Sequence, residues 1–243
     1  MGKAVLISGG TKGIGLAVVD ALHAAGHRVA TFCPFADERE AFTAQYQSAC
    51  QAGMIACFDG TVSDEKSVAS VVERTVQAFG QIDVLINNAG VAYYEEAQQA
   101  SLDQVRAMFE VNVFGAMALT KAVLPLMRAA KSGQIIATLS TSSRHVSPRA
   151  SLYGASKHAL LGYLQGLRAE VRESGIKVAA VIPGLTRTGI LAANELTRRP
   201  QGEQQMLEPS EVARAFMFII DQPATSDIRE VVLTPAGSTR YHF

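Results

Sequence analysis

Short runs of β-branched residues alternate with longer segments of helical periodicity along almost the whole chain. The runs have the length of buried strands, and the segments between them repeat apolar residues at the three- and four-residue spacing of an amphipathic helix. The predicted strands are 5–8, 29–33, 54–58, 84–86, 135–139, 178–182 and 231–233. The predicted helices include 16–25, 67–79, 102–129, 153–174 and 209–220. This alternation predicts an α/β fold of the Rossmann type, a doubly wound, seven-stranded parallel sheet with helices on both faces.

The chain has the size and apolar content of one domain. It contains 243 residues, of which 48% are hydrophobic, so a single core over residues 1–243 is expected. The segment 186–209 interrupts the alternation, because it is polar and arginine-rich and contains Pro200 and Gly202. Since it directly follows a predicted strand, we expect a flexible insertion over the substrate site.

Charge and cysteine content exclude several classes of partner. The 22 basic residues balance 22 acidic ones, so no global field attracts nucleic acid or an anionic membrane, and we expect small-molecule partners. No cleavable hydrophobic segment starts the chain and no apolar stretch reaches bilayer length, which favours a cytoplasmic protein. Cys33, Cys50 and Cys57 lack the spacing of metal ligands, so we predict reduced, structural thiols and no metal site.

A glycine-rich segment follows the first predicted strand and opens the first helix. Residues 8–15 read Ser-Gly-Gly-Thr-Lys-Gly-Ile-Gly, a context in which the backbone can approach a pyrophosphate at a helix N-terminus. The spacing of Gly9, Gly13 and Gly15 differs from the G-x-G-x-x-G dinucleotide fingerprint. Taken alone, the segment is compatible either with phosphate binding or with an ordinary tight turn.

Further motifs follow in the order of one known family. Asn-Asn-Ala-Gly occupies residues 87–90, Tyr-Gly-Ala-Ser-Lys residues 153–157, and Pro-Gly-Leu-Thr-Arg-Thr residues 183–188. With the glycine turn, they resemble the classical short-chain dehydrogenase/reductase family over the chain from Val5 to about Leu233, including its NADP-dependent carbonyl and 3-ketoacyl reductases. The resemblance implies that Asn112, Ser140, Tyr153 and Lys157 are catalytic. It implies that the cofactor is bound by Gly9, Thr11, Lys12, Gly13, Ile14, Gly15, Asn88, Ala89, Gly90, Tyr153, Lys157, Pro183, Gly184, Thr186 and Thr188.

The tyrosine and lysine of this set suit proton transfer. Tyr153 and Lys157 are one helical turn apart, and a nearby positive charge is expected to lower the pKa of a phenol. Such a pair alone is common in helices, and Ser142 and Ser143 could replace Ser140 on chemistry alone. The family's thirteen-residue separation selects Ser140, whose hydroxyl would polarise the substrate carbonyl. Asn112 is unfavourable within a long helix, which supports a functional role.

The second strand bears on the choice of cofactor. It ends in Thr-Phe-Cys-Pro at 31–34, with no carboxylate for the adenosine ribose hydroxyls, and Lys12 would attract a 2′-phosphate. NADP(H) is therefore favoured, while NAD(H) stays possible, because Pro34 stands where NADP-dependent family members have an arginine. Arg39 is a candidate replacement. The residue that contacts adenine is either Asp59 or Thr61.

The expected reaction is NADPH-dependent reduction of a ketone. The alternatives are an NAD-dependent alcohol dehydrogenase and a non-catalytic dinucleotide-binding regulator. The resemblance also implies a homodimer or homotetramer, formed through the helices that start near Leu102 and Tyr153. The expected substrate walls are 91–96, 144–151 and 189–205, with His145 as a weak candidate for substrate contact. Arginines in these walls either meet an acidic substrate or are solvated, namely Arg144, Arg149, Arg198 and Arg199.

Overall fold

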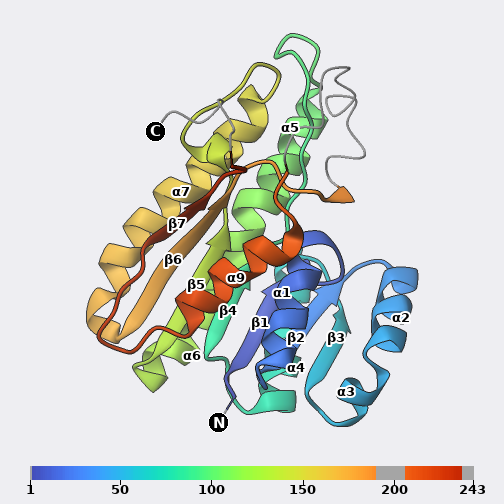
Figure 1. Cartoon of the computed structure of the whole chain (residues 1–243), viewed down its shortest axis with the longest axis vertical. Helices are drawn as coiled ribbons and strands as arrows, with labels where there is room; N and C mark the ends of the chain where they lie inside the picture. Colours follow the sequence, from blue (N-terminus) through green and yellow to red (C-terminus); the bar gives the residue numbers. More distant parts are fainter. Residues whose placement is uncertain (1, 190–205, 237–243) are drawn as a thin grey trace.

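The computed structural model describes residues 2–189 and 206–236 (Figure 1). Within these ranges, seven strands form one parallel sheet in the order β3-β2-β1-β4-β5-β6-β7. The order reverses between β1 and β4, and ligands of doubly wound sheets bind at such a switch point. The predicted fold class is confirmed. The strands are β1 (Ala4–Ser8), β2 (Arg28–Cys33), β3 (Ile55–Asp59), β4 (Val84–Asn87), β5 (Gly133–Thr138), β6 (Ile176–Pro183) and β7 (Glu230–Leu233).

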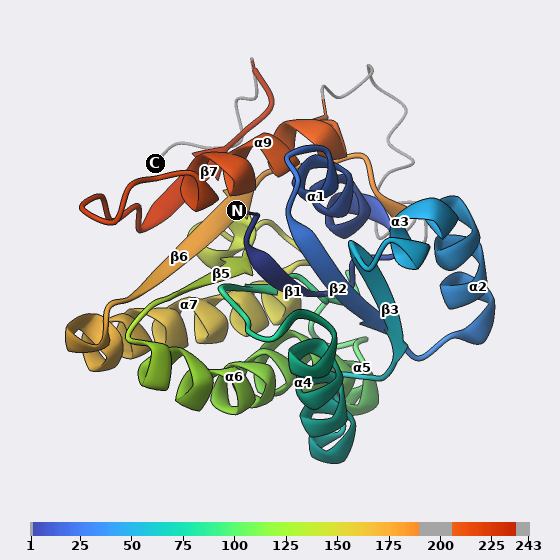
Figure 2. The same ribbon diagram turned by 90° about the horizontal axis from the view of Figure 1, so that it is seen from below.

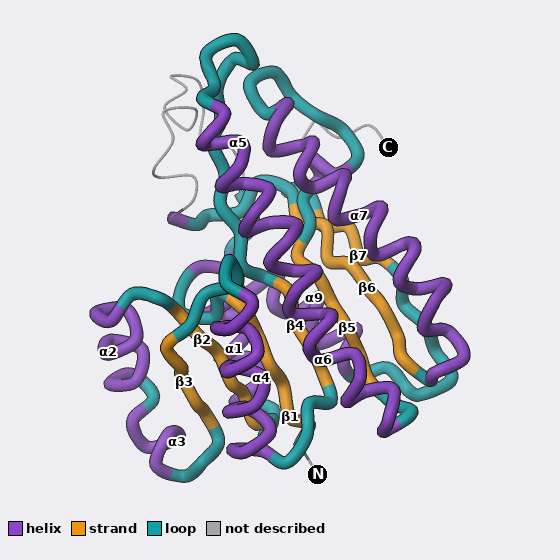
Figure 3. The backbone as a smooth tube through the Cα atoms, turned by 180° about the vertical axis from the view of Figure 1, so that it is seen from behind, coloured by secondary structure: helices purple, strands orange, loops and turns teal. Residues whose placement is uncertain are grey.

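Helices cover both faces of the sheet (Figure 2). One face carries α1 (Gly13–Ala24), α2 (Ala36–Gln45), α3 (Gln47–Gln51) and α9 (Pro209–Ile220). The other carries α4 (Glu65–Phe79), α6 (Ala116–Ala130) and α7 (Ser151–Val171), which lie in front of the strands in Figure 3. The remaining elements are α5 (Leu102–Phe109), the π-helix η1 (Glu110–Gly115) and the 3₁₀ turns η2 (Thr141–Ser143) and η3 (Arg172–Ser174).

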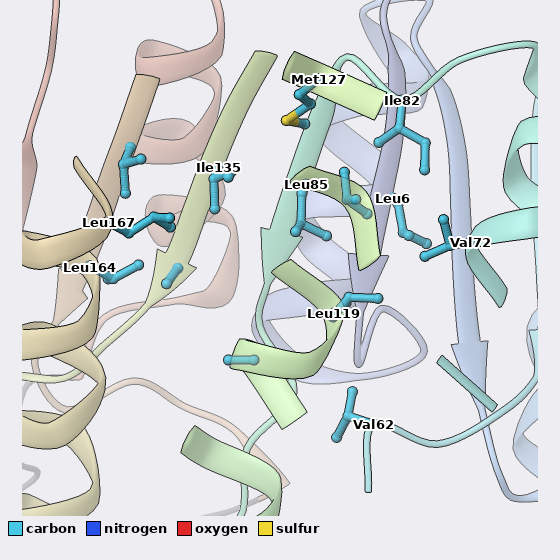
Figure 4. Close-up of a cluster of buried hydrophobic side chains, with 14 of the residues drawn as sticks. Leu6, Val62, Val72, Ile82, Leu85, Leu119, Met127, Ile135, Leu164 and Leu167 are labelled. Carbon is cyan, nitrogen blue, oxygen red and sulfur yellow. The ribbon is translucent and has the colours of Figure 1, made fainter. Parts of the chain in front are cut away.

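The alternation of side chains along each strand divides the core into two layers. Val5 and Ile7 of β1 pack toward α1 and α9, whereas Leu6 packs toward α4 and α6. Figure 4 shows Leu6 and Leu85 of the second layer beside Leu119 of α6. Because both faces are covered, the strands are apolar almost throughout, as parallel strands require.

The predicted strands agree with the observed ones to within a few residues, but the sequence analysis did not include helices α2 and α3. Helix α2 buries only Phe42, and the five residues of α3 bury none. Such helices lack the apolar stripe on which periodicity depends. The local signals are clearer at α4, where the Asp64 side chain accepts a hydrogen bond from the Ser67 amide and Gly80 ends the helix with a φ of 80°.

The helical stretch Leu102–Ala130 corrects one expectation. Among the described helices, this 29-residue stretch is long and apolar enough to cross a membrane by length and composition, so the expectation that no stretch reaches that length was wrong. Of its most apolar window, 44% is buried inside the protein. Leu119 and Val123 of α6 are buried in the core layer that also contains residues of α4 and of the strands. The stretch therefore has the environment of a core helix.

His27, which directly precedes β2, makes the stability dependent on pH. It is buried, and its Nδ1 accepts a 2.9 Å hydrogen bond from the backbone N–H of Lys3. Burial lowers the pKa of this imidazole below its ordinary value, so the unfolded chain binds the proton more readily than the folded protein. We therefore expect stability to be fully present above about pH 6.5 and to fall as the pH drops below it.

Urea unfolding between about pH 7.5 and 5.5 measures this effect, above the range in which most carboxylates titrate. His27→Asn keeps a hydrogen-bond acceptor but does not titrate, so its midpoint should change less with pH than that of the wild type. An equal pH dependence in the two proteins would contradict the role of His27.

Candidate active site

The glycine turn lies at the carboxyl end of β1 and leads into α1. Gly9 and Gly13 have φ angles of 66° and 58°, a left-handed conformation that side chains disfavour. A Cβ at Gly15 would lie 2.0 Å from the Gly9 carbonyl oxygen, so only glycine fits there. The N-cap residue Lys12 makes no capping hydrogen bond through its side chain. The first amides of α1 therefore face the open end of the turn, an arrangement that fits the pyrophosphate of a dinucleotide.

We expect Gly15→Ala to destabilise the protein by about 1–3 kcal/mol, the usual range for overpacking. The same change should weaken dinucleotide binding, because the Gly9 carbonyl must move and the turn with it. Thermal unfolding and calorimetric titration with NADPH measure the two effects. Gly166→Ala is the matched control, since its Cβ would meet no atom within 4 Å on helix α7 and should be neutral or stabilising. A Gly15→Ala protein as stable as this control would refute the steric argument.

Asn88 connects the glycine turn to the centre of the sheet through hydrogen bonds. Its Nδ2 donates to the Gly9 carbonyl at 2.9 Å and its backbone N–H donates to Ser8 Oγ at 3.0 Å. Its Oδ1 accepts a 2.9 Å hydrogen bond from Thr138 Oγ1 on β5. The side chain thus links the ends of β1, β4 and β5 at the switch point.

Ser140, Tyr153 and Lys157 come together at the carboxyl end of β5. Ser140 follows β5, and its hydroxyl shares a hydrogen bond with the phenol of Tyr153 in the first turn of α7. Lys157 Nζ lies 5.8 Å from the centroid of the Tyr153 ring and donates to the Thr138 carbonyl at 2.9 Å. Ser143, one of the two alternatives on chemistry alone, is buried and donates to the Ser140 carbonyl at 2.6 Å, whereas Ser140 and Ser142 both line the cleft. The Ser142 backbone N–H donates to Ser140 Oγ at 3.1 Å.

Burial changes the pKa values of Tyr153 and Lys157. It raises the pKa of Tyr153 to about 12, against a lowering contribution from the hydrogen bond with Ser140. Burial also lowers the pKa of Lys157 to about 8. In the protein without cofactor the pKa of the phenol is therefore not lowered, because loss of solvation outweighs the hydrogen bond with Ser140. The phenol therefore carries its proton at neutral pH and can act as an acid. That Lys157 lowers this pKa together with an oxidised nicotinamide stays a prediction.

Asn112 lies behind the cleft wall in the π-helix η1. Its Oδ1 accepts from the Val91 backbone N–H at 2.8 Å, and its Nδ2 donates to the Val91 carbonyl at 2.9 Å and to Ser156 Oγ at 3.1 Å. These bonds tie the loop after β4 to α7, which explains an asparagine in the middle of a helix. The proton relay predicted for Asn112 stays a prediction.

The sequence analysis did not identify Ser156 as a site residue. It is fully buried, and its hydroxyl accepts from Asn112 and donates to the Tyr153 carbonyl at 2.7 Å. The only signal for it in the sequence is a small polar residue on the inner face of the helix, between the tyrosine and the lysine. Its contacts set the position of the first turn of α7 relative to η1.

One cleft of about 1560 Å³ runs along the switch point. This volume exceeds the roughly 300–1,000 Å³ of a site for one small ligand, and it leaves room for a dinucleotide together with a substrate. Every residue predicted to bind the cofactor lines this cleft, as do Ser140, Tyr153 and Lys157. No group of three or more potential metal ligands occurs among the residues that the structure describes.

The carboxyl end of β2 holds a carboxylate that the sequence analysis missed. Glu38 of α2 lines the cleft, and its carboxylate forms an ion pair with Lys12, with Oε1 2.8 Å from Lys12 Nζ. Its Oε2 accepts from Thr11 Oγ1 at 3.2 Å and from Cys33 Sγ at 3.3 Å. The expectation that no acidic side chain occupies this place was wrong, because α2 brings in a residue five positions beyond the strand.

Arg39 and Asp59 face away from the cleft. The Arg39 guanidinium pairs with Asp59 at 2.8 Å and donates to the Cys33 carbonyl at 2.9 Å, and neither residue lines the cleft. Arg39 therefore does not occupy the position of the family's phosphate-binding arginine. Thr61 does line the cleft, so of the two candidates for adenine contact it is the one with access.

The substrate end of the cleft is lined by aromatic and small residues. The ring of Tyr94 lies 5.4 Å from that of Tyr153, and residues 91–94 contribute most of the predicted first wall. Arg144 forms an ion pair with Glu230, and neither it, His145 nor Arg149 lines the cleft. Arg198, Arg199 and the wall 190–205 lie outside the described residues.

The described ends of the predicted insertion are paired with each other. The Arg187 backbone N–H donates to the Leu207 carbonyl at 2.9 Å, and the Leu207 N–H donates to the Leu185 carbonyl at the same distance. Arg187 Nε also pairs with Glu208 at 2.9 Å. Thr188, predicted to bind the nicotinamide end of the cofactor, is held over the glycine turn, with its Cγ2 atom 3.5 Å from the position of a Cβ on Gly13.

The amino-acid sequence is similar to those of known proteins. The family model described as short chain dehydrogenase matches residues 3–199. An uncharacterized oxidoreductase of Staphylococcus saprophyticus is 29% identical over 236 residues, covering 96% of this chain and 97% of that protein. The dehydrogenase/reductase SDR family member 7B of Rattus norvegicus is 35% identical over 199 residues, or 79% of this chain, and the match spans 60% of that relative's length.

The fold is shared as well. The crystal structure of an alcohol dehydrogenase from Thermococcus sibiricus, complexed with 5-hydroxy-NADP, superposes with a TM-score of 0.86 at 22% identity and covers 100% of both chains. The non-catalytic alternative finds no support, because three of the four predicted catalytic residues line one cleft and the fourth lies directly behind it. The chain belongs to the short-chain dehydrogenase family and is an oxidoreductase that acts on CH–OH groups with NAD(P).

Proposed function

We propose that the protein reduces the carbonyl group of a small molecule to an alcohol with NADPH as the hydride donor. The observation that carries this proposal is that Ser140, Tyr153 and Lys157 line one cleft at the switch point of the sheet, with Lys157 Nζ 5.8 Å from the centroid of the Tyr153 ring. Two hydroxyls that line the cleft, together with the buried ammonium of Lys157, suit a reaction in which a carbonyl oxygen gains negative charge and then a proton.

The side chains have distinct roles in this reaction. A bound nicotinamide supplies the hydride. The hydroxyls of Ser140 and Tyr153 both donate to the substrate oxygen and hold the carbonyl in place. Tyr153 then releases its proton to that oxygen, and the ammonium of Lys157 stabilises the phenolate that is left. In the opposite direction the same groups accept the proton of an alcohol.

Lys12 and one structural relative support NADP(H). Lys12 lies in the glycine turn, where a cation can pair with a 2′-phosphate. The similar protein from Thermococcus sibiricus is known in complex with an NADP derivative. The Glu38 carboxylate beside Lys12 favours the second candidate, oxidation of a secondary alcohol with NAD, because it offers an acceptor for the ribose hydroxyls.

Cofactor consumption over a panel of ketones, aldehydes and acyl thioesters tests the proposal. Rates are measured with NADPH and NADH side by side, and secondary alcohols are tested in parallel with NADP and NAD. We expect carbonyl reduction with NADPH to give the highest kcat/KM. A higher kcat/KM for alcohol oxidation with NAD than for any carbonyl with NADPH would replace the proposal by the second candidate.

We also propose a homodimer or homotetramer. Leu102 and Phe114 project from the long helical stretch with exposed fractions of 68% and 55%, and an apolar surface of this kind is commonly covered in an oligomer. Light scattering of the purified protein tests this proposal, and a monomer at all concentrations would refute it.

A further inference from the structure

The ring of Tyr94 forms a wall of the cleft beside the catalytic tyrosine. Tyr94 is half-buried, and its ring centroid lies 5.4 Å from that of Tyr153, with an angle of 53° between the two ring planes. This separation is within the range of about 4.5–7 Å over which aromatic rings attract one another. A substrate whose oxygen reaches the Tyr153 hydroxyl therefore brings the substituents of its carbonyl carbon close to the Tyr94 ring.

Hydrogen bonds hold the loop that carries Tyr94. Three residues earlier in the chain, the buried side chain of Asn112 bonds both backbone groups of Val91, at 2.8 Å and 2.9 Å. Asn112 also donates to Ser156, which belongs to the same helix as Tyr153. The two tyrosines are thus connected through buried polar contacts as well as through their rings. A ring held in this way can bind a substrate with little loss of conformational freedom.

The charged side chains of the cleft make contacts within the protein. Among the described residues, those that line the cleft are Lys12, Glu38, Lys157, Arg187 and Glu211. Lys12 pairs with Glu38, and Arg187 pairs with Glu208. Glu211 accepts a 2.7 Å hydrogen bond from the Glu208 backbone N–H, and the lysine of the catalytic group donates to a backbone carbonyl. Apart from that lysine, the described part of the cleft therefore offers a substrate an aromatic ring and no unpaired charge.

We infer that Tyr94 determines the substrate specificity and selects an aryl ketone, whose ring packs against that of Tyr94 while its carbonyl oxygen accepts hydrogen bonds from Ser140 and Tyr153. The inference rests on the proposed reductase function. An aromatic ring on the carbonyl carbon gains an offset or edge-to-face attraction to Tyr94 that a saturated ring of the same size lacks. The preference is therefore for a flat aromatic substituent, and not for apolar bulk alone.

Steady-state rates with acetophenone and cyclohexyl methyl ketone test this inference, because the two ketones have the same carbon skeleton and differ in the aromaticity of the ring. The readout is the ratio of their kcat/KM values at saturating reduced cofactor. Comparing this ratio between variants removes the difference in intrinsic reactivity of the two ketones. Tyr94→Leu should lower the ratio about three- to tenfold, the contribution of one aromatic pair. Tyr94→Phe keeps the ring and should stay within about twofold of the wild type.

Phe35→Leu is the matched control. Phe35 also lines the cleft, and it is 57% exposed two residues beyond the end of β2. Because β2 lies three strands away from β5 in the sheet, the ends of these two strands are about 14 Å apart. The variant removes an aromatic ring from the same cleft but far from the catalytic group, so it should change the ratio by less than about twofold. Thermal unfolding checks that all variants are folded.

A Tyr94→Leu ratio that equals that of Phe35→Leu, or that exceeds the wild-type ratio, would overturn the inference while the reductase function stands. Oxidation of 1-phenylethanol and 1-cyclohexylethanol with NADP and with NAD separates the two proposals. A Tyr94-dependent preference for the phenyl alcohol in a protein that reduces no ketone would refute the proposed reductase activity and leave the role of Tyr94 in place. Turnover of none of the four compounds by the wild type would overturn the inference.

Discussion

Tyr153→Phe is expected to lower kcat by about two to four orders of magnitude, the range that general acid catalysis usually contributes. The variant loses the only atom of this side chain that can donate a proton to the substrate oxygen. Its ring keeps the same volume and the same packing against Tyr94, whose centroid lies 5.4 Å away. Fold and cofactor binding should therefore be preserved, and the loss should fall on kcat more than on the dissociation constant of the cofactor.

Measurement of kcat at saturating cofactor and carbonyl substrate, together with calorimetric titration of NADPH, separates these effects. Tyr46→Phe is the control, because it also removes a hydroxyl that makes a hydrogen bond, here to Asp20 on α1, in a part of the protein that does not line the cleft. It should retain nearly full turnover and lose stability by about 1 kcal/mol. Comparable activity of Tyr153→Phe and Tyr46→Phe would exclude Tyr153 as the acid.

Lys157→Met is expected to abolish most activity and to make the cofactor-free protein more stable near pH 7. Lys157 is buried, and its pKa falls from 10.5 to about 8, which corresponds to roughly 3 kcal/mol of destabilisation while the group is charged. Methionine has a similar length and needs no solvation. Loss of the 2.9 Å hydrogen bond to the Thr138 carbonyl offsets about 1 kcal/mol, so the net gain should be about 2 kcal/mol.

The pH dependence provides a second measure of the same effect. The lowered pKa means that the unfolded chain holds the Lys157 proton more tightly, so wild-type stability should rise as the pH increases from about 8 toward 10.5. The difference in free energy of unfolding between Lys157→Met and the wild type should become smaller over the same interval. Lys121→Met, at an exposed position of α6, is the control and should stay within about 0.5 kcal/mol of the wild type.

Chemical denaturation of the cofactor-free proteins gives the free energies of unfolding for this comparison. A Lys157→Met protein that is less stable than the wild type near pH 7 would show that the ammonium contributes to the fold. The expected result, a more stable Lys157→Met protein, would instead show that the buried ammonium lowers the stability of the fold, which is common for catalytic groups.

The elements that bury a regular apolar pattern were predictable. The strands of the sheet and the helices α4, α7 and α9 have periodic apolar residues because each faces a core layer, so the pattern of the core is present in the chain itself. Helices α2 and α3 bury little and show no such pattern. The missed helix is also the one that carries Glu38, so the error in the fold led directly to the error about the cofactor site.

The local motifs determined the identity of the site. Gly9 and Gly13 mark positions of left-handed backbone conformation, and Gly15 marks a position where a Cβ is excluded. The spacing of Ser140, Tyr153 and Lys157 corresponds to the end of β5 and the first turns of α7. These constraints act between neighbours in the chain or along one element, and they can therefore be recognised in the sequence.

The tertiary structure alone decided the protonation and the pairing of charges within the site. Burial raises the pKa of Tyr153 and lowers that of Lys157, and burial is a property of the packed domain. The pairing of Lys12 with Glu38, and the turning of Arg39 toward Asp59, join side chains whose approach depends on where α2 lies against β2. The sequence by itself determined the fold class, the family and the candidates for the catalytic residues, because these depend on local spacing. The electrostatics of the cleft came from the fold, because charges interact through space and the distances between them are set by packing.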